Sequence, residues 1–250
     1  MTLLDRTQSR VALITGAAKR LGAEIARTLH SAGNNIVLHY RDSSDEAQHL
    51  CDDLNQIRPD SAVIIQADLF ETSALSLLVT QSAQYWQRLD ILINNASAFY
   101  PTPIGKIAED DWDNLLGINL KAPFFLSQSA AAWLQKEQGC IVNIDDIHAQ
   151  RSLKDHSVYS ISKAGLRALT LSLAKELGPE IRVNGVSPGA ILWPEHELTD
   201  HKKQQILSRI TLKRTGHPID IAKAVCFLVH DADYITGHIL VVDGGRTLFS

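Results

Sequence analysis

Residues 11–22, Val-Ala-Leu-Ile-Thr-Gly-Ala-Ala-Lys-Arg-Leu-Gly, decide the fold, because an apolar run leads directly into a turn that contains two glycines. The run at 11–15 is continuous rather than alternating, which is typical of a strand covered on both faces. Gly16 permits a tight turn, and Gly22 lets the following helix pack closely and open its N-terminus toward a phosphate. The stretch predicts a phosphate-binding strand–turn–helix unit, with an ordinary strand–helix turn as the alternative.

The alternation of apolar runs and helical stretches continues along the chain. Leu21, Ile25 and Leu29 recur every fourth position after the first run, and Gly33 follows as a helix stop. Further continuous apolar runs lie at residues 36–40, 62–67, 91–94, 141–144, 181–186 and 239–242. This pattern predicts an α/β fold, in which a doubly wound parallel sheet of about seven strands carries helices on both faces. Without a linker, repeat or low-complexity tract, residues 1–250 are expected to form a single domain.

Composition excludes several classes of protein. The 250 residues are 45% hydrophobic and 21% charged, which rules out a mainly disordered chain. The net charge of −4 is spread along the chain without a basic run, so we expect no nucleic acid partner. No apolar run is long enough for a membrane span, and the first residues lack the pattern of a secretory signal. We therefore expect no membrane association and a cytoplasmic protein.

The three cysteines also argue for a reducing compartment. Cys51, Cys140 and Cys226 lie far apart and form no CxxC pair, so neither a disulfide framework nor a structural zinc site is expected. His196 and His201 flank a segment similar to a zinc-protease helix, but they are five residues apart where one helical face requires four. No metal site is predicted.

Charged residues after the second run bear on the choice of cofactor. In doubly wound sheets the ligand lies outside the carboxyl ends of the strands, where an acid suits the ribose of NAD and a cation suits the 2′-phosphate of NADP. Arg41 and Ser43, with Lys19 or Arg20 from the first loop, form a candidate site for that phosphate and favour NADPH. Asp42 is equally suited to bind a ribose hydroxyl or to pair with Arg41.

Tyr159 and Lys163 open the longest predicted helix. Residues four apart lie on the same helical face, so the phenol and the ammonium become neighbours. A nearby cation favours the phenolate, which predicts a lowered pKa for Tyr159 and easier proton transfer. Taken alone, a Tyr-x3-Lys pair occurs by chance in many helices.

Other motifs accompany this pair in a fixed order: residues 94–97, Asn119, residues 143–146, residues 187–189 and residues 243–245. With them, the chain resembles the short-chain dehydrogenase/reductase family over essentially its whole length. The resemblance implies a Rossmann-type fold that binds a nicotinamide dinucleotide. It also implies that Tyr159 donates a proton, that Lys163 holds the nicotinamide ribose, and that Asn119 supports a proton-relay water.

The resemblance further implies a set of cofactor-binding positions and a quaternary structure. Asp68 would bind the adenine amino group, and Asn95 and Ala96 would line the adenosine ribose. The whole set comprises Gly16, Lys19, Arg20, Leu21, Gly22, Tyr40, Arg41, Ser43, Asp68, Leu69, Asn95, Ala96, Ser97, Tyr159, Lys163, Pro188, Gly189 and Ala190. A homotetramer is the assembly that the family implies.

Two positions depart from the family pattern: Arg20 replaces a loop glycine, and Asp146 replaces the catalytic serine, thirteen residues before Tyr159. A carboxylate 4 Å from the alkoxide of a ketone reductase would cost up to about 4 kcal/mol near a protein surface. A C=N substrate has the opposite need, because its nitrogen must gain a proton. Asp146 therefore favours C=N reduction. Two alternatives are an acid that only caps the loop, or Asp145 as the pocket residue if the register slips by one.

Both departures, together with Ser97 in the run 94–103, resemble the pteridine reductase branch of the family. This branch implies a pterin ring sandwiched between the nicotinamide and Phe99, where aromatic stacking contributes about 0.5–1.5 kcal/mol. It places its phosphate-binding cation one position later than Arg41, at Asp42. Core packing is the alternative role for Phe99. The substrate-binding positions implied are Arg20, Ser97, Phe99, Asp146 and Tyr159.

The sequence thus predicts an NADPH-dependent pteridine reductase, which converts dihydrobiopterin or dihydrofolate to the tetrahydro form. A ketone reductase, such as a 3-oxoacyl thioester reductase, is the alternative, and an inactive nucleotide-binding member of the family is a remote one. Residues 190–214 are expected to form a mobile lid over this small-molecule site, or else a fixed connection. His148 and His156 are expected at the pocket wall or on the surface.

Overall fold

The computed structural model describes residues 9–192 and 199–248 and confirms the predicted fold class. Seven strands form one sheet in the order β3-β2-β1-β4-β5-β6-β7, and every pair is parallel. The strands are β1 (Val11–Ile14), β2 (Asn35–Tyr40), β3 (Ala62–Gln66), β4 (Ile91–Asn94), β5 (Cys140–Ile144), β6 (Arg182–Pro188) and β7 (Ile239–Val242). The order reverses at β1, which is the switch point where ligands bind in such sheets.

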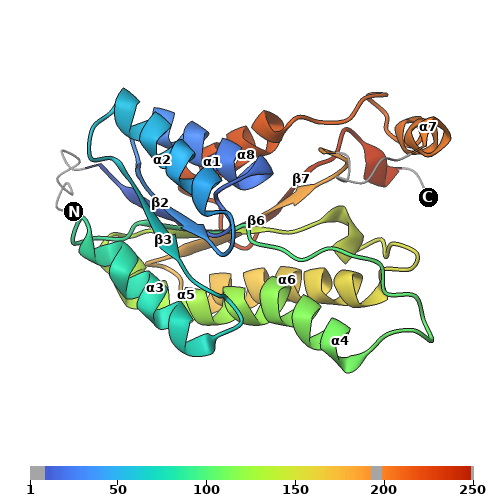
Figure 1. Ribbon diagram of the computed structural model, residues 1–250, viewed down its shortest axis with the longest axis horizontal. Helices are drawn as coiled ribbons and strands as arrows, with labels where there is room; N and C mark the ends of the chain where they lie inside the picture. The colour runs from blue at the N-terminus through green and yellow to red at the C-terminus, as the bar shows by residue number, and fades with distance from the viewer. Residues whose placement is uncertain (1–8, 193–198, 249–250) are drawn as a thin grey trace.

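Helices cover both faces of the sheet, as Figure 1 shows. The helices are α1 (Arg20–Ser31), α2 (Ser44–Ile57), α3 (Thr72–Gln84), α4 (Glu109–Leu116), α5 (Ala122–Lys136), α6 (Ser157–Glu176), α7 (Asp200–Ser208) and α8 (Pro218–His230). Three short turns accompany them: the π-helical turn η1 (Gly117–Lys121) and the 3-10 turns η2 (Ile147–Ala149) and η3 (Arg246–Leu248). Helices α1, α2 and α8 lie on one face, and α3, α5 and α6 lie on the other. Among the described residues, no helix is long and apolar enough to cross a membrane.

The continuous apolar runs are explained by two cores, one on each face. Ala12 and Ile14 of β1 belong to the core under α1 and α8, whereas Val11 and Leu13 belong to the core under α3, α5 and α6. All four side chains are fully buried. Because successive strand residues point to opposite faces, a strand with two cores must be apolar at every position.

The strand ends lie within one residue of the predicted runs, except at the end of β6. The run at 181–186 continues as β6 to Pro188, because Ser187 and Pro188 pair with Val241 and Val242 of β7. Gly33 is confirmed as the helix stop, since it directly follows the C-cap of α1 and turns the chain toward β2 with a φ of +92°.

A buried carboxylate ties the strands together at their amino ends. Asp90, just before β4, accepts hydrogen bonds from the Val11 backbone N–H at 2.8 Å and from the Arg88 guanidinium at 2.6 and 2.9 Å. Gly139, directly before β5, lies beside it, and a Cβ added there would lie 2.3 Å from the Asp90 carbonyl oxygen. Glycine is required at this position for space.

We therefore expect Gly139→Ala to lower the free energy of unfolding by about 2–3 kcal/mol, the usual scale of overpacking in a tight site. Urea unfolding followed by circular dichroism measures this change. Ligand binding per folded molecule should be unaffected, because such sheets bind ligands at the carboxyl ends of their strands and Gly139 lies at the amino ends. An unchanged unfolding midpoint would contradict the close packing described here.

Candidate active site

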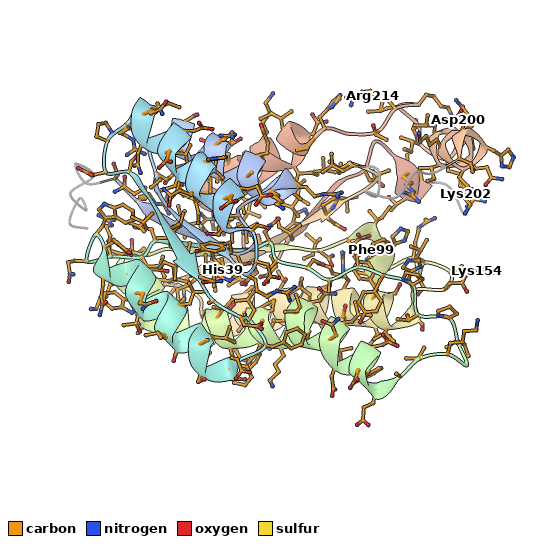
Figure 2. The ribbon with its side chains drawn as sticks, viewed as in Figure 1. His39, Phe99, Lys154, Asp200, Lys202 and Arg214 are labelled. Atoms are coloured by element: carbon orange, nitrogen blue, oxygen red, sulfur yellow. The ribbon has the colours of Figure 1, made fainter. Side chains whose placement is uncertain are left out.

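A cleft of about 1220 Å³ lies at the carboxyl ends of the strands, where the fold predicts a ligand. Its volume exceeds the 300–1,000 Å³ that is usual for one small ligand, so it has room for a dinucleotide and a second ring. Figure 2 shows Phe99 at this end of the molecule, together with Lys154 and with Asp200 and Lys202 of α7. Most of the sequence-predicted residues line the cleft.

The first loop is shaped for close backbone approach. Gly16 has a φ of +61° and donates its N–H to Nδ1 of His39 at 3.0 Å. Burial lowers the pKa of His39 to about 4, so its ring is neutral and can accept this bond. A Cβ on Gly22 would lie 2.2 Å from the Gly16 carbonyl oxygen. These features fit a dinucleotide phosphate at the N-terminus of α1.

Arg20 takes a conformation that favours glycine. It has a φ of +52°, at the position where the family pattern carries a loop glycine. An arginine in this left-handed region costs free energy relative to glycine. Because Arg20 also lines the cleft, we interpret the strain as the consequence of placing a guanidinium in the site.

All of the cofactor-binding positions predicted from the sequence except Asp68 line the cleft. They are Gly16, Lys19, Arg20, Leu21, Gly22, Tyr40, Arg41, Ser43, Leu69, Asn95, Ala96, Ser97, Tyr159, Lys163, Pro188, Gly189 and Ala190. Asn95 also fixes the first loop, since its amide donates to the carbonyl oxygens of Thr15 and Gly16 at 2.8 and 3.0 Å.

The cations expected at a 2′-phosphate are each paired with an acid. Arg41 Nε lies 2.7 Å from Asp42 Oδ2, and Lys19 Nζ lies 2.6 Å from Glu46 Oε1. The pairing of Asp42 with Arg41 is one of the alternatives that the sequence left open. All four side chains are substantially exposed, so each cation can exchange its carboxylate partner for a phosphate.

Two predicted residues lie off the cleft lining. Asp68 accepts a hydrogen bond from the Phe70 N–H at 3.0 Å and so shapes the turn after β3, while its neighbour Leu69 lines the cleft. Asn119 is fully buried in the π-helical turn. Its amide donates to Ala98 O and Ser162 Oγ, and accepts from Ser97 Oγ and Ala98 N–H, all at 2.9–3.0 Å.

These four bonds use the full hydrogen-bonding capacity of the Asn119 amide. The side chain thus ties the loop after β4 to α6, and in this way positions Ser97 and Ala98. The prediction that Asn119 supports a relay water stays a prediction.

Asp146 and Tyr159 meet on the lining of the same cleft. The Tyr159 hydroxyl donates to Asp146 Oδ2 at 2.8 Å, and the His148 backbone N–H donates to Asp146 Oδ1 at 2.8 Å. One carboxylate oxygen therefore caps η2 while the other faces the phenol, so the capping and pocket interpretations both hold. The adjacent Asp145 faces Arg167 instead, at 3.4 Å.

The pKa of Tyr159 shifts opposite to our prediction. Burial raises it well above the usual value, and the negative charges of Asp146 and Asp145 raise it further. Lys163 does not offset this, because its ammonium donates to the Ile144 carbonyl at 2.8 Å and lies 6.0 Å from the centre of the Tyr159 ring. The phenol therefore keeps its proton at neutral pH and can donate it.

Phe99 is exposed to the cleft rather than packed in the core. Its side chain is 49% exposed, its ring stacks on His156 at 4.8 Å, and it meets the Tyr159 ring edge-on at 4.7 Å. An aromatic ring thus stands beside the proton donor, at the mouth of the cleft. From the sequence, His156 was predicted only to lie at the pocket wall or on the surface. Its contact with Phe99 was not predicted, because the two residues are far apart in the chain.

Arg246 is a cleft residue that the sequence analysis missed. It lies in η3 near the C-terminus, lines the cleft, and carries a charge that acts on Asp146. Burial lowers the pKa of its guanidinium. The sequence feature that could have pointed to Arg246 is the motif at 243–245. The Asp243 carboxylate accepts hydrogen bonds from the Gly245 and Thr247 N–H groups at 2.8 and 2.7 Å, and these bonds fold the turn that contains Arg246.

The segment expected to be a lid borders the cleft. Pro188, Gly189 and Ala190 line it, followed by Ile191 and Leu192. Residues 193–198, which include the two residues Trp193 and Pro194, lie outside the described part of the chain. Helix α7 has no buried residue, yet its Ile206 also lines the cleft. In the described residues, no group of three or more His, Cys, Asp or Glu side chains is arranged to hold a metal ion.

Several known proteins match the chain along nearly its whole length. A family model described as enoyl-(acyl carrier protein) reductase matches residues 16–247. Pteridine reductase 1 of Leishmania tarentolae is 36% identical over 279 residues, which covers 95% of this chain and 96% of the relative. The 3-oxoacyl-(acyl-carrier-protein) reductase FabG of Staphylococcus aureus is 33% identical over 241 residues, covering 95% and 98%. Short chain dehydrogenase mdpC of Emericella nidulans is 29% identical, covering 96% of each chain.

The buried Asp145 generates a prediction about stability and pH. Burial raises its pKa from 3.8 to about 6, so between these values the folded state holds a proton that the unfolded chain has released. The free energy of unfolding therefore falls as pH rises through this window. Asp145→Asn, which stays neutral, should be more stable than wild type above about pH 6, by an amount of the order of 2 kcal/mol.

Urea unfolding at several pH values measures this difference, which should disappear near pH 4. The exposed Asp233→Asn is the matched control, and its stability should follow wild type throughout. A variant at position 145 that is less stable than wild type at pH 8 would show that the buried charge is favourable.

Proposed function

The chain belongs to the short-chain dehydrogenase/reductase family of oxidoreductases, and from this premise we propose that it is an NADPH-dependent pteridine reductase. The proposed reaction reduces a ring C=N bond of dihydrobiopterin or dihydrofolate to the tetrahydro form. The observation that carries the proposal is the hydrogen bond from the Tyr159 hydroxyl to the Asp146 carboxylate inside the cleft, 2.8 Å long.

The cofactor-binding positions of the cleft support a nicotinamide dinucleotide. The close approach of Gly16 and Gly22, and the cations Lys19 and Arg41, fit phosphate groups. When bound, NADPH supplies the hydride. Lys163 is the residue proposed to hold the nicotinamide ribose, since its ammonium lies on the cleft lining and the Ile144 carbonyl accepts one of its three protons.

Tyr159 and Asp146 are the residues proposed to protonate the substrate nitrogen. Reduction of a C=N bond adds a hydride to carbon and a proton to nitrogen. The high pKa of Tyr159 keeps the phenolic proton in place until a basic nitrogen accepts it. Because a phenolate beside the ionised Asp146 is unfavourable, Asp146 is proposed to take a proton from solvent and pass it to Tyr159 as the phenol gives up its own.

Phe99 supports a flat heteroaromatic substrate. Its half-exposed ring stands edge-on to Tyr159, so a ring stacked on Phe99 would lie beside the proton donor. In the structure His156 already covers one face of Phe99. A pterin would therefore use the opposite face or displace the imidazole.

A ketone reductase is the second candidate, because the oxoacyl reductase of Staphylococcus aureus is nearly as similar as the pteridine reductase. Its reaction places negative charge on an oxygen beside the proton donor, where Asp146 would repel it. At 4 Å this repulsion reaches about 4 kcal/mol near a protein surface, roughly a thousandfold in rate. An inactive nucleotide-binding protein is the remote third candidate, and the intact Tyr159 and Lys163 argue against it.

A substrate panel should separate these candidates. Oxidation of NADPH, and of NADH in parallel, is followed with dihydrobiopterin, dihydrofolate and an acetoacetyl thioester. We expect turnover of a pterin or folate with NADPH, and little with the thioester. A preference for the thioester would establish the ketone reductase, and binding of the nucleotide without turnover of any substrate would establish the inactive protein.

Substitution at Asp146 tests its role directly. Asp146→Asn keeps an oxygen that can accept the His148 N–H but removes the charge, and it should lower kcat for pterin reduction by about 10²-fold or more. Asp146→Ser should have the same direction of effect, and neither should change the Kd for NADPH appreciably. Tyr159→Phe should remove most of the activity. Pterin reduction at the wild-type rate by Asp146→Ser would show that the acid is incidental.

A further inference from the structure

The end of β5 meets one face of α6 through three consecutive residues. Asp146 accepts from Tyr159, the Ile144 carbonyl accepts from Lys163, and Asp145 pairs with Arg167. The α6 partners are spaced four residues apart, so they lie along one helical face. The first two of these contacts belong to the proposed reaction. The proposed reaction does not use the third contact, between Asp145 and Arg167.

Asp145 lies where a negative charge is energetically unfavourable. Its side chain is fully buried, and its backbone N–H donates to the Val186 carbonyl at 2.8 Å, which fixes it beside β6. Its Oδ2 lies 3.4 Å from Arg167 Nη1, whereas its Oδ1 has no hydrogen-bond partner among the described residues. A buried carboxylate with an unpaired oxygen destabilises the fold, so a structural role alone does not explain it.

Lys163 is the group that gains from this carboxylate. The ammonium is fully buried, and burial lowers its pKa, while the negative charges of Asp146 and Asp145 raise it. Removing one of two nearby carboxylates would leave the ammonium easier to deprotonate. The charged and titratable groups that face this region are Asp145, Asp146, Tyr159, Lys163 and Arg167, with Arg246 acting on Asp146 from η3.

We propose that Asp145 is a positioning residue, whose buried carboxylate is the counter-charge that keeps the Lys163 ammonium charged in the cofactor cleft while Arg167 anchors that carboxylate. The inference rests on the proposed function only in that Lys163 contacts the bound cofactor. Asp145 lies on the cleft lining, but its side chain is fully buried and faces Arg167, so it acts through Lys163. Its effect should be confined to alkaline pH, where an ammonium can be lost.

Cofactor binding as a function of pH tests the inference without any turnover. The Kd for NADPH is measured by fluorescence between pH 7 and 10.5 for wild type, Asp145→Asn and Arg167→Gln. In Asp145→Asn the alkaline loss of affinity should begin about one pH unit lower, with the Kd at pH 7 unchanged. In Arg167→Gln it should begin at the wild-type pH or higher, because Asp145 is retained and a cation is removed.

The opposite directions expected for the two variants separate a charge effect from a structural one. A merely structural pair would weaken binding in both variants at every pH. Asp145→Glu, which restores the charge, should recover part of the wild-type profile, and the exposed Asp233→Asn should match wild type. The proposal would be overturned if NADPH affinity in Asp145→Asn began to fall at the same alkaline pH as in wild type. It would also be overturned if this variant lost affinity equally at all pH values.

Titration of the Lys163 side chain by NMR in the cofactor-free protein is the second readout. The Lys163 signal, identified by its absence in Lys163→Arg, should titrate about one pH unit lower in Asp145→Asn than in wild type. This readout does not depend on the substrate or even on binding. If pterins were not reduced but the shift occurred, the proposed function would fail and this inference would stand. If pterins were reduced without the shift, only the inference would fail.

Discussion

The hydrogen bond between Tyr159 and Asp146 is the interaction on which the account of this protein depends. It places a carboxylate beside a buried phenol, and the proposal of a C=N substrate rests on these two groups. A developing anion would be repelled there, whereas a nitrogen that must gain a proton would be helped. Two cations lie near this pair: the buried Lys163 on α6 and the half-buried Arg246 in η3, and the charge of Asp146 acts on both.

The two ends of the sheet differ in how their buried carboxylates are paired. At the amino ends, Asp90 is well paired, with Arg88 and the Val11 N–H. At the carboxyl ends, where doubly wound sheets bind their ligands, Asp145 is buried with one unpaired oxygen. Positive φ is not confined to the ligand end, since Asp60, Gln87 and Gln138 adopt it before β3, β4 and β5, as Arg20 does at the cleft.

The sequence predicted what depends on local periodicity. Continuous apolar runs identified all seven strands, because a strand with a core on each face is apolar throughout. The spacing of Tyr159 and Lys163 placed them on one helical face. It did not give the direction of the pKa shift of Tyr159, because burial and the charge of Asp145 depend on how β5 packs against α6. For the same reason the full set of bonds around Asn119 and the position of Arg246 became visible only in three dimensions.

The most direct test of the central claim is a crystal structure of the ternary complex with NADP⁺ and a dihydropterin. The account predicts that the ring nitrogen that must gain the proton lies within about 2.6–3.2 Å of the Tyr159 hydroxyl, or one water away. It also predicts that the Asp146 carboxylate remains bonded to that hydroxyl, with the pterin stacked on Phe99. A complex in which Asp146 turns away from Tyr159 into solvent, with no proton donor near the nitrogen, would contradict it.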